Sequence, residues 1–321
     1  MQCNNFLQLN RDRKSKKMDE MNYFKQSFKY FKRKHSPEIL NRVLNIEAHC
    51  IPECATLLKD FARENVCDKC TTCVNLGLKP HEEWQVYTFK GLNGFYYIRN
   101  PFTTNAQQYW VRKCLAQYTR KPSVSNLDIH HNNIDDIWAL YEAGKCTFMD
   151  KLAWVTLGYH YNWDKKIYER TKFSSFPLCL SELVKHIASC LNFKTFDPDA
   201  AIINYYNMKS TLGIHNDHSE EEPNEPIVSI SFGLTAIFLM GTAKVEEKPL
   251  PLFLKSGDIV LMSGQSRFAY HAVPAVIQEL VDCDWNCDED DTAWKPYSDY
   301  IKLHRINISV RQVYPLAEIK V

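Results

Sequence analysis

His215 and Asp217 stand two residues apart in a polar segment that follows a predicted strand. Side chains two apart in an extended chain point to the same side, so both can bind one ion. His271 follows an aromatic segment at the edge of another predicted strand. Two histidines and one carboxylate, with coordination positions left open, form the facial triad of non-haem Fe(II) oxygenases. The spacing therefore predicts Fe(II) binding, although each residue taken singly also suits a polar turn or a buried core histidine.

Residues 305–311 alternate strictly between polar and apolar side chains, which predicts a half-buried strand. Its polar face would carry Arg305, Asn307, Ser309 and Arg311. Inward-facing arginines are costly unless each meets an anion. A dicarboxylate is suitable, because a guanidinium binds a carboxylate through two parallel hydrogen bonds. We therefore expect a bound dicarboxylate; the alternative is an exposed edge strand with ordinary salt bridges.

Short apolar runs predict the strands that must position these residues, at 201–206, 227–232 and 235–240. Earlier in the chain, apolar spacing predicts helices at 106–118, 137–141 and 180–191, and a hairpin at 84–100. Helices thus precede the sheet and strands dominate after residue 200. This order predicts an α+β fold in which helices cover one face of the sheet.

The order His-x-Asp, later His, Arg-x-Asn-x-Ser-x-Arg is the pattern of the AlkB family of 2-oxoglutarate dioxygenases. The chain resembles this family over roughly residues 84–313, and the segments 154–164, 203–206, 210–215 and 310–313 look like its homologue 1 branch. The resemblance implies a double-stranded β-helix (jelly-roll) core buttressed by helices. We expect a basic tail and amphipathic helix at 1–36 as an N-terminal helical extension, a cysteine-containing linker or wrap at 37–83, and the dioxygenase domain at 84–315.

The resemblance also implies the roles of the site residues. Fe(II) would be bound by His215, Asp217 and His271, with 2-oxoglutarate and O₂ as cosubstrates. Five residues would bind 2-oxoglutarate: Arg305 at the far carboxylate with Asn204 and Tyr206 as further donors, and Asn307 and Arg311 at the carboxylate nearer the metal. Arg311 would also neutralise Asp217. The reaction implied is oxidation of a methyl group, with release of formaldehyde from an N-methyl substrate.

The segment 159–168 is aromatic, polar and basic, and occupies the place of the nucleotide-recognition lid in that family. An aromatic lid suits a flipped or single-stranded base, which stacks on rings. Four residues are candidate substrate contacts: Tyr159, Tyr161, Trp163 and Tyr168. The alternative is a β-hairpin with cross-strand aromatic pairs, and both interpretations can hold together.

The formal net charge is only +1, so binding of a polyanion requires a local basic patch. A predicted helix at 23–34 offers one. Phe24, Phe28 and Phe31 recur with helical spacing and can dock the helix on the catalytic domain. Beside them three lysines recur with the same spacing and are candidate phosphate contacts: Lys25, Lys29 and Lys32. In the alternative interpretation the helix only packs, with its lysines in solvent.

Nucleic acid, either tRNA or DNA with an unpaired or flipped base, is the expected partner. The alternatives are a protein-directed dioxygenase or demethylase, for instance on histone tails, and an abasic-site lyase side activity. The sequence does not determine which methylated base is used. No apolar run approaches the ~20 residues that span a bilayer, so we expect a soluble monomer without a membrane segment. The acid-poor basic start at 1–17 suits a mitochondrial presequence or a solvated tail, and we expect a location in the mitochondrion, the nucleus or the cytoplasm.

Five of the twelve cysteines lie close together, between residues 50 and 73. The spacing Cys67-x2-Cys70-x2-Cys73 is typical of metal ligands, and Cys54 or Cys50 could complete a zinc site. We therefore keep a Zn²⁺ site at Cys54, Cys67, Cys70 and Cys73 as a hypothesis. The alternative is a loop with reduced cysteines; a disulfide framework is not expected in a reducing compartment.

Overall fold

The computed structural model describes residues 22–33, 36–47, 52–59, 61, 71–129, 134–145, 147–278, 285 and 291–316. The basic tail at 1–17, with its presequence hypothesis, lies outside these residues, as do Cys50, Cys67 and Cys70. In the described part of the chain, no helix is both long enough and apolar enough to span a membrane.

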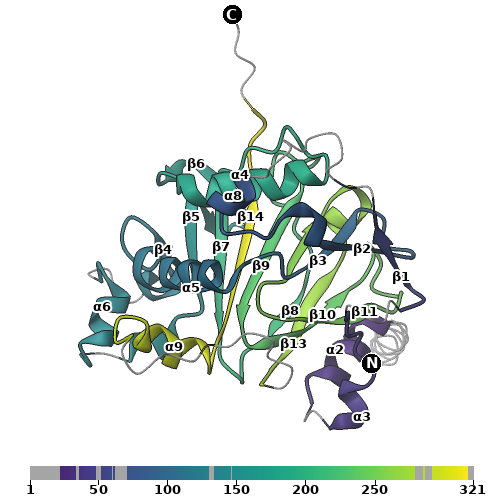
Figure 1. The fold of residues 1–321 in the computed structure, drawn as a ribbon, viewed down its shortest axis with the longest axis horizontal. Coiled ribbons are helices and arrows are strands. Elements are labelled where there is room, and N and C mark those ends of the chain that lie inside the picture. The colour runs from purple at the N-terminus through teal and green to yellow at the C-terminus, as the bar shows by residue number, and fades with distance from the viewer. Residues whose placement is uncertain are drawn as a thin grey trace, which may run out of the picture.

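The described strands form two antiparallel sheets (Figure 1). The larger sheet has the order β1 (Ala55–Leu58), β2 (Gln85–Phe89), β3 (Phe95–Arg99), β12 (Ile259–Met262), β9 (Ile227–Gly233), β14 (Arg305–Arg311), β7 (Ala200–Tyr206), β5 (Trp154–Asn162) and β4 (Val124–Ser125), with β6 (Ile167–Phe173) paired to β5. The smaller sheet has the order β11 (Leu250–Leu254), β10 (Thr235–Met240), β13 (His271–Ile277) and β8 (Leu212–His215).

Strands β7 to β14 divide equally between the sheets, β12-β9-β14-β7 in one and β11-β10-β13-β8 in the other. This is the arrangement of a jelly roll. Apolar side chains of both sheets, among them Val260 and Phe238, form one core cluster between them. The predicted α+β fold with a jelly-roll core is therefore confirmed.

Helices cover the outer face of the larger sheet (Figure 1). They are α4 (Thr71–Asn75), α5 (Thr104–Arg112), α6 (Ile137–Glu142), α7 (Phe148–Lys151), α8 (Leu178–Cys190) and α9 (Lys295–Ile301). A π-helical turn at Lys113–Gln117 continues α5, and short 3-10 helices occur at His81–Glu83, Asn126–Ile129 and Gly264–Phe268. In α8 the buried side chains recur with helical spacing, at Leu180, Leu183, Val184 and Ile187, as its sequence predicts.

The outer face of the smaller sheet is covered by α2 (Tyr23–Phe31), with α3 (Pro37–Leu40) following it. The Asn22 side chain caps α2 by accepting a hydrogen bond from the Lys25 N–H at 2.7 Å. Phe24 and Phe31 are buried against β10, β11 and β13, so the aromatic face docks as predicted. Strand β1, from the predicted linker at 37–83, pairs with β2 at the edge of the larger sheet.

Strand β14 lies between β9 and β7, in the middle of the larger sheet. Its apolar residues, such as Ile308, enter the core beneath the helices, and its polar residues face the other side. The predicted alternation is confirmed. The expected half-burial is wrong, because both faces are covered: Arg305 is 1% exposed and Arg311 is 4% exposed. The alternative of an exposed edge strand is wrong for the same reason.

Candidate metal and cosubstrate site

The polar face of β14 and the adjoining ends of β8 and β13 enclose a cavity of about 510 Å³. The residues predicted to bind iron or 2-oxoglutarate all line it: Asn204, Tyr206, His215, Asp217, His271, Arg305, Asn307 and Arg311. They converge because the two sheets of the jelly roll face each other, so that side chains from opposite sheets share one interior space.

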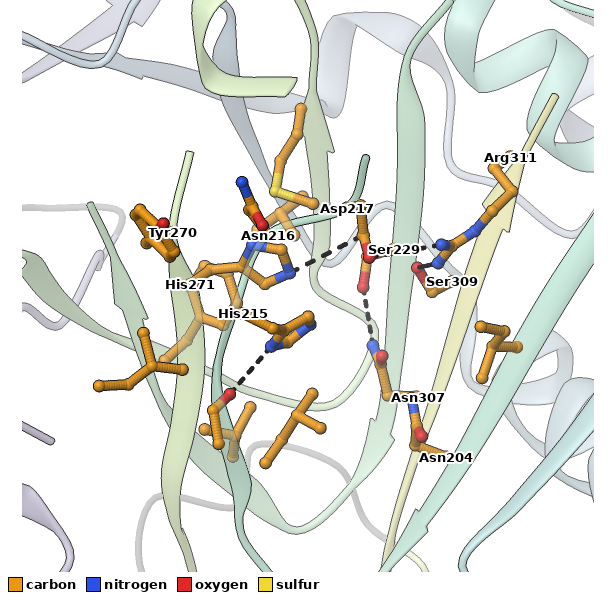
Figure 2. A pocket seen from close by; sticks show the side chains of 18 of the residues that line it. Asn204, His215, Asn216, Asp217, Ser229, Tyr270, His271, Asn307, Ser309 and Arg311 are labelled. Atoms are coloured by element: carbon orange, nitrogen blue, oxygen red, sulfur yellow. Dashed lines mark hydrogen bonds and ion pairs between the residues drawn. The ribbon is translucent and has the colours of Figure 1, made fainter. Parts of the chain in front are cut away.

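The three predicted iron ligands lie close together on the smaller sheet and the loop after it (Figure 2). His215 and His271 are cross-strand partners in the β8–β13 pair, and their ring centroids are 4.2 Å apart. Asp217 Oδ2 lies 3.9 Å from His271 Nε2. One ligand atom from each residue lies within 4.8 Å of the others, so a single ion can bridge all three.

Local hydrogen bonds orient both imidazoles. The Nδ1 of His215 lies 2.9 Å from the Gly213 carbonyl oxygen, and the Nδ1 of His271 lies 3.1 Å from that of Ala269. With the proton on Nδ1, each ring donates to its carbonyl and keeps the Nε2 lone pair for a metal. Burial, assisted by His215, lowers the pKa of His271 to about 4. His271 is therefore neutral at physiological pH, the form that binds metal.

Two carboxylates and two guanidiniums form a network behind the triad. Arg311 Nη1 lies 3.5 Å from Asp217 Oδ1 and 2.9 Å from Glu220 Oε1. Glu220 Oε2 lies 2.9 Å from Arg267 Nη2, and Arg267 Nη1 donates to the Asp217 carbonyl oxygen at 2.8 Å. Although burial acts to raise the pKa of Asp217, Arg311 and the two histidines hold it below its usual range. Asp217 therefore remains a carboxylate.

Sequence reasoning missed Glu220 and Arg267. Glu220 is the first of three consecutive glutamates, and nothing local separates it from Glu221 and Glu222. Arg267 belongs to no recognisable motif. Their buried ion pair forms because the loop after β8 packs against the Gly264–Phe268 turn. This is a tertiary contact, which no local sequence pattern reveals.

Arg305 differs from Arg311 in having no ion-pair partner among the described residues. Its guanidinium donates to the carbonyl oxygens of Leu234 and Leu254, at 3.3 and 3.2 Å, and to Ser231 Oγ at 2.7 Å. Its Nε is buried without a hydrogen-bond partner. Burial lowers the pKa of Arg305 to about 10, which leaves it charged at physiological pH. A buried cation with a vacant donor fits an anionic ligand.

The register of β14 and β7 sets the remaining polar residues beside this guanidinium. Arg305 is the cross-strand partner of Tyr206, and Asn307 is that of Asn204. The Asn307 amide donates to Ser229 Oγ at 2.8 Å (Figure 2). It also donates to the Ile230 carbonyl oxygen at 3.1 Å. Its amide N–H groups are thus engaged with β9, which leaves its carbonyl oxygen for other contacts.

The predicted lid is a hairpin of β5 and β6, and only part of it reaches the cavity. Tyr161 and Trp163 line the cavity, with ring centroids 4.8 Å apart, and Trp163 is 43% exposed. Tyr159 and Tyr168 do not line it. Tyr168 is buried in a small apolar cluster with Tyr314, and the Tyr159 ring lies 4.6 Å from that of Tyr314. The hairpin interpretation is confirmed, and the lid interpretation stays a prediction.

Lys166, in the turn of the same hairpin, also lines the cavity and was not among the predicted substrate contacts. The three lysines of α2 do not line it. Lys29 and Lys32 are exposed and Lys25 is half-buried, on the outer side of the smaller sheet.

The predicted cysteine set is not brought together in the described residues. Cys54 is half-buried in the turn before β1, where its carbonyl oxygen accepts from Lys90 N–H. Cys73 is fully buried, and its sulfur contacts His81 and His186. Cys67 and Cys70 lie outside the described residues. Among the described residues, Cys73 therefore contacts two histidines, which the spacing of the cysteines did not predict.

The sequence of this chain matches a known protein family and several characterised relatives. The family model of the 2OG-Fe(II) oxygenase superfamily matches residues 94–311. The human nucleic acid dioxygenase ALKBH1 is 40% identical over 268 residues, which cover 74% of this chain and 68% of the human protein. The tRNA demethylase abh1 of Schizosaccharomyces pombe is 33% identical over 72% of this chain and 82% of its own length. The DNA N(6)-methyladenine demethylase ALKBH1A of Arabidopsis thaliana is 29% identical over 71% of this chain and 78% of its own.

Proposed function

Because this chain belongs to the AlkB family of the 2OG-Fe(II) oxygenase superfamily, we propose that it removes or oxidises methyl groups on bases of tRNA or DNA. It is an Fe(II)- and 2-oxoglutarate-dependent dioxygenase that uses O₂. The relatives named for nucleic acid, tRNA and DNA substrates support this substrate class. Within the site, the observation that carries the proposal is the triad of His215, Asp217 and His271 at the floor of a cavity that is bordered by an aromatic hairpin.

His215, Asp217 and His271 would hold the iron, since their ligand atoms already converge and both histidines present Nε2. The bound iron, with 2-oxoglutarate and O₂, supplies the oxidising chemistry at a methyl C–H bond. The protein contributes a fixed geometry, three ligands that leave coordination positions open, and a negative charge on Asp217 that Arg311 compensates.

Arg305 would bind the far carboxylate of 2-oxoglutarate, because it is the buried arginine of β14 without a carboxylate partner among the described residues. Tyr206 and Asn204 on the neighbouring strand would add hydrogen bonds. Asn307 would face the carboxylate nearer the metal and would have to redirect an amide N–H group from β9 to donate to it. Arg311 is already paired with Asp217 and Glu220. Its part in this proposal is therefore mainly to orient Asp217.

Tyr161 and Trp163 would hold the methylated base, because both lie on the cavity wall and Trp163 remains substantially exposed. A base stacked on such rings gains about 1–3 kcal/mol. Lys166 at the same edge would meet the phosphate backbone.

The test is anaerobic reconstitution with Fe(II) and 2-oxoglutarate, admission of O₂ with methylated tRNA or DNA, and mass spectrometry of the nucleosides. We expect succinate to form in step with loss of a methylated nucleoside, accompanied by formaldehyde where the methyl group is on nitrogen and by an oxidised nucleoside where it is on carbon. A methylated histone-tail peptide serves as the comparison substrate. If the peptide supports turnover and no nucleic acid does, the proposed substrate class is wrong while the dioxygenase assignment stands.

A further inference from the structure

Two cysteines and two histidines meet outside the catalytic cavity, where α4 lies beside α8 (Figure 1). Cys73 on α4 and His81 come from one stretch of chain. His186 and Cys190 are one helical turn apart on α8, so they share one face of that helix. His81 and His186 are 105 residues apart in sequence. The fold has therefore joined two separate Cys/His pairs.

The ligand atoms of Cys73, His81 and His186 all lie within 4.8 Å of one another, and Cys190 Sγ lies beside the two imidazoles. The two Nε2 atoms are 3.1 Å apart. Cys73 Sγ lies 3.3 Å from His81 Nε2 and 3.2 Å from His186 Nε2, and Cys190 Sγ lies 3.0 and 3.8 Å from the same two atoms. Around a tetrahedral Zn²⁺, its usual bond lengths give N···N separations of about 3.3 Å and S···N separations of about 3.5 Å. These five distances lie within roughly 0.5 Å of those values. Because Cys190 is not in the mutually close set, a bound ion would have to draw its Sγ toward that of Cys73.

Hydrogen bonding alone does not account for this arrangement. Five short separations link four atoms, and a thiol or a neutral imidazole Nε2 carries at most one hydrogen. The four atoms therefore cannot supply a hydrogen to every separation, and two protonated Nε2 atoms at 3.1 Å would repel each other. A cation between the four atoms turns all of these separations into the edges of one coordination polyhedron.

The surroundings suit a closed structural site. Cys73 is fully buried and Cys190 is 4% exposed. The ring of Trp84 packs edge-on against His81, with centroids 5.0 Å apart, and the Trp84 indole N–H donates to the Lys79 carbonyl oxygen at 2.8 Å. This apolar wall excludes solvent from one side, whereas a catalytic zinc site keeps one position open to water or substrate.

We propose that Cys73, His81, His186 and Cys190 bind a structural Zn²⁺ ion. Two thiolates and two imidazoles are a ligand set that favours zinc. The ion would fasten the segment 71–83, which leads into β2, to α8, which packs on the outer face of the larger sheet. This ligand set is an alternative to the all-cysteine set predicted from spacing, of which Cys67 and Cys70 lie outside the described residues. The proposal does not depend on the substrate of the dioxygenase site.

Metal analysis of the full chain tests this. The parent protein should carry His215→Ala and Asp217→Ala, so that zinc bound at the iron site is not counted. We expect about one zinc per chain, lost in Cys73→Ser and in His186→Ala but retained in Cys114→Ser. Cys114 is an equally buried thiol on the π-helical turn, distant in sequence from both pairs, and so controls for loss of a core sulfur. Background zinc in the parent, or equal zinc in Cys73→Ser and Cys114→Ser, overturns the proposal.

A second measurement avoids variants that fail to fold. Zinc removal from the parent by a chelator should lower its thermal midpoint, and added Co²⁺ should give thiolate-to-metal charge-transfer absorption. An unchanged midpoint with no such band overturns the proposal. The fourth ligand is tested separately with Cys190→Ser and Cys70→Ser, since Cys70 forms a Cys-x2-Cys pair with Cys73. Zinc lost in Cys190→Ser supports the ligand set; zinc kept there and lost in Cys70→Ser overturns the assignment of Cys190.

Discussion

The Glu220 carboxylate lies 2.9 Å from the Arg267 guanidinium in an ion pair whose side chains are each 1% exposed. The other carboxylate oxygen of Glu220 holds Arg311 Nη1 at 2.9 Å, and the same Nη1 lies 3.5 Å from Asp217. Glu220 thus positions Arg311 behind an iron ligand. It also balances the second positive charge, which would otherwise be buried without compensation.

Glu220→Gln should therefore destabilise the protein strongly. It leaves two buried guanidiniums with one carboxylate, and breaking a buried pair of this kind costs about 3–5 kcal/mol. Glu221→Gln is the matched control, because Glu221 forms an exposed pair with Arg170 and should cost less than about 1 kcal/mol. Denaturant unfolding of both variants measures the difference. Equal losses would show that the charge of Glu220 is not needed for the network.

His215→Ala and Asp217→Ala should each abolish iron-dependent turnover of 2-oxoglutarate. His215→Ala should preserve stability, whereas Asp217→Ala should fold with lower stability, because Arg311 loses one of its two carboxylate partners. Both side chains lie at the end of β8 or just after it, not in the apolar core. His218→Ala is the control, since its Nδ1 already contacts Asn216 and it is not a member of the triad. Succinate formation and circular dichroism are the measurements. Turnover at the parent rate in either triad variant would rule out that residue as a ligand.

Arg305→Lys should be nearly as damaging as Arg305→Ala. A lysine keeps the charge but cannot bind a carboxylate through two parallel hydrogen bonds. Loss of a charged hydrogen bond of about 1.5–3 kcal/mol corresponds to a rise of roughly 10- to 150-fold in KM for 2-oxoglutarate. The KM for 2-oxoglutarate, measured at saturating nucleic acid, should rise more than kcat falls. If KM is unchanged, the far carboxylate is bound elsewhere.

Trp163→Ala and Tyr159→Ala should separate the two functions of the β5–β6 hairpin. Trp163 is exposed on the cavity wall, so its loss should weaken substrate binding by about 1–3 kcal/mol with little change in stability. Tyr159 packs against Tyr314 and Phe173, so its loss should lower stability and leave substrate affinity largely intact. Titration of a methylated oligonucleotide and thermal unfolding give the two readouts. If Tyr159→Ala weakened substrate binding and Trp163→Ala only lowered stability, the base would be bound on the Tyr159 side of the hairpin.

Replacing Lys25, Lys29 and Lys32 together by Ala tests whether α2 binds phosphate. Phe24 and Phe31 hold the helix on the smaller sheet, so the fold should survive. We expect weaker binding of every RNA or DNA ligand, and a slope of log K against log salt reduced by about 0.7–0.9 for each phosphate that a lysine no longer neutralises. Turnover of a free methylated nucleoside should be unchanged. An unaltered affinity and salt slope would mean that α2 only packs.

The His215-x-Asp217 pair and the arginine strand could be predicted because both are short-range patterns, whereas His271 was assigned from the order of the family's motifs. The His215-x-Asp217 spacing and the alternation of β14 follow from the two-residue repeat of extended chain, which any local segment expresses. The same holds for α8, whose apolar spacing marks its buried face. Even so, the alternation of β14 did not show that both of its faces are covered. That depends on its position between β9 and β7.

Contacts between distant segments were decided only by the tertiary structure. Glu220 acquires its role from Arg267, 47 residues away, and is indistinguishable in sequence from Glu221. Cys73 meets His186 across 113 residues, although its nearest candidate partners in sequence are cysteines. Ligand spacing within one segment restricts which residues can share an ion. Which residues actually meet is determined by the packing of one element on another, here α4 against α8. Side chains from separate elements come together only when the core has assembled.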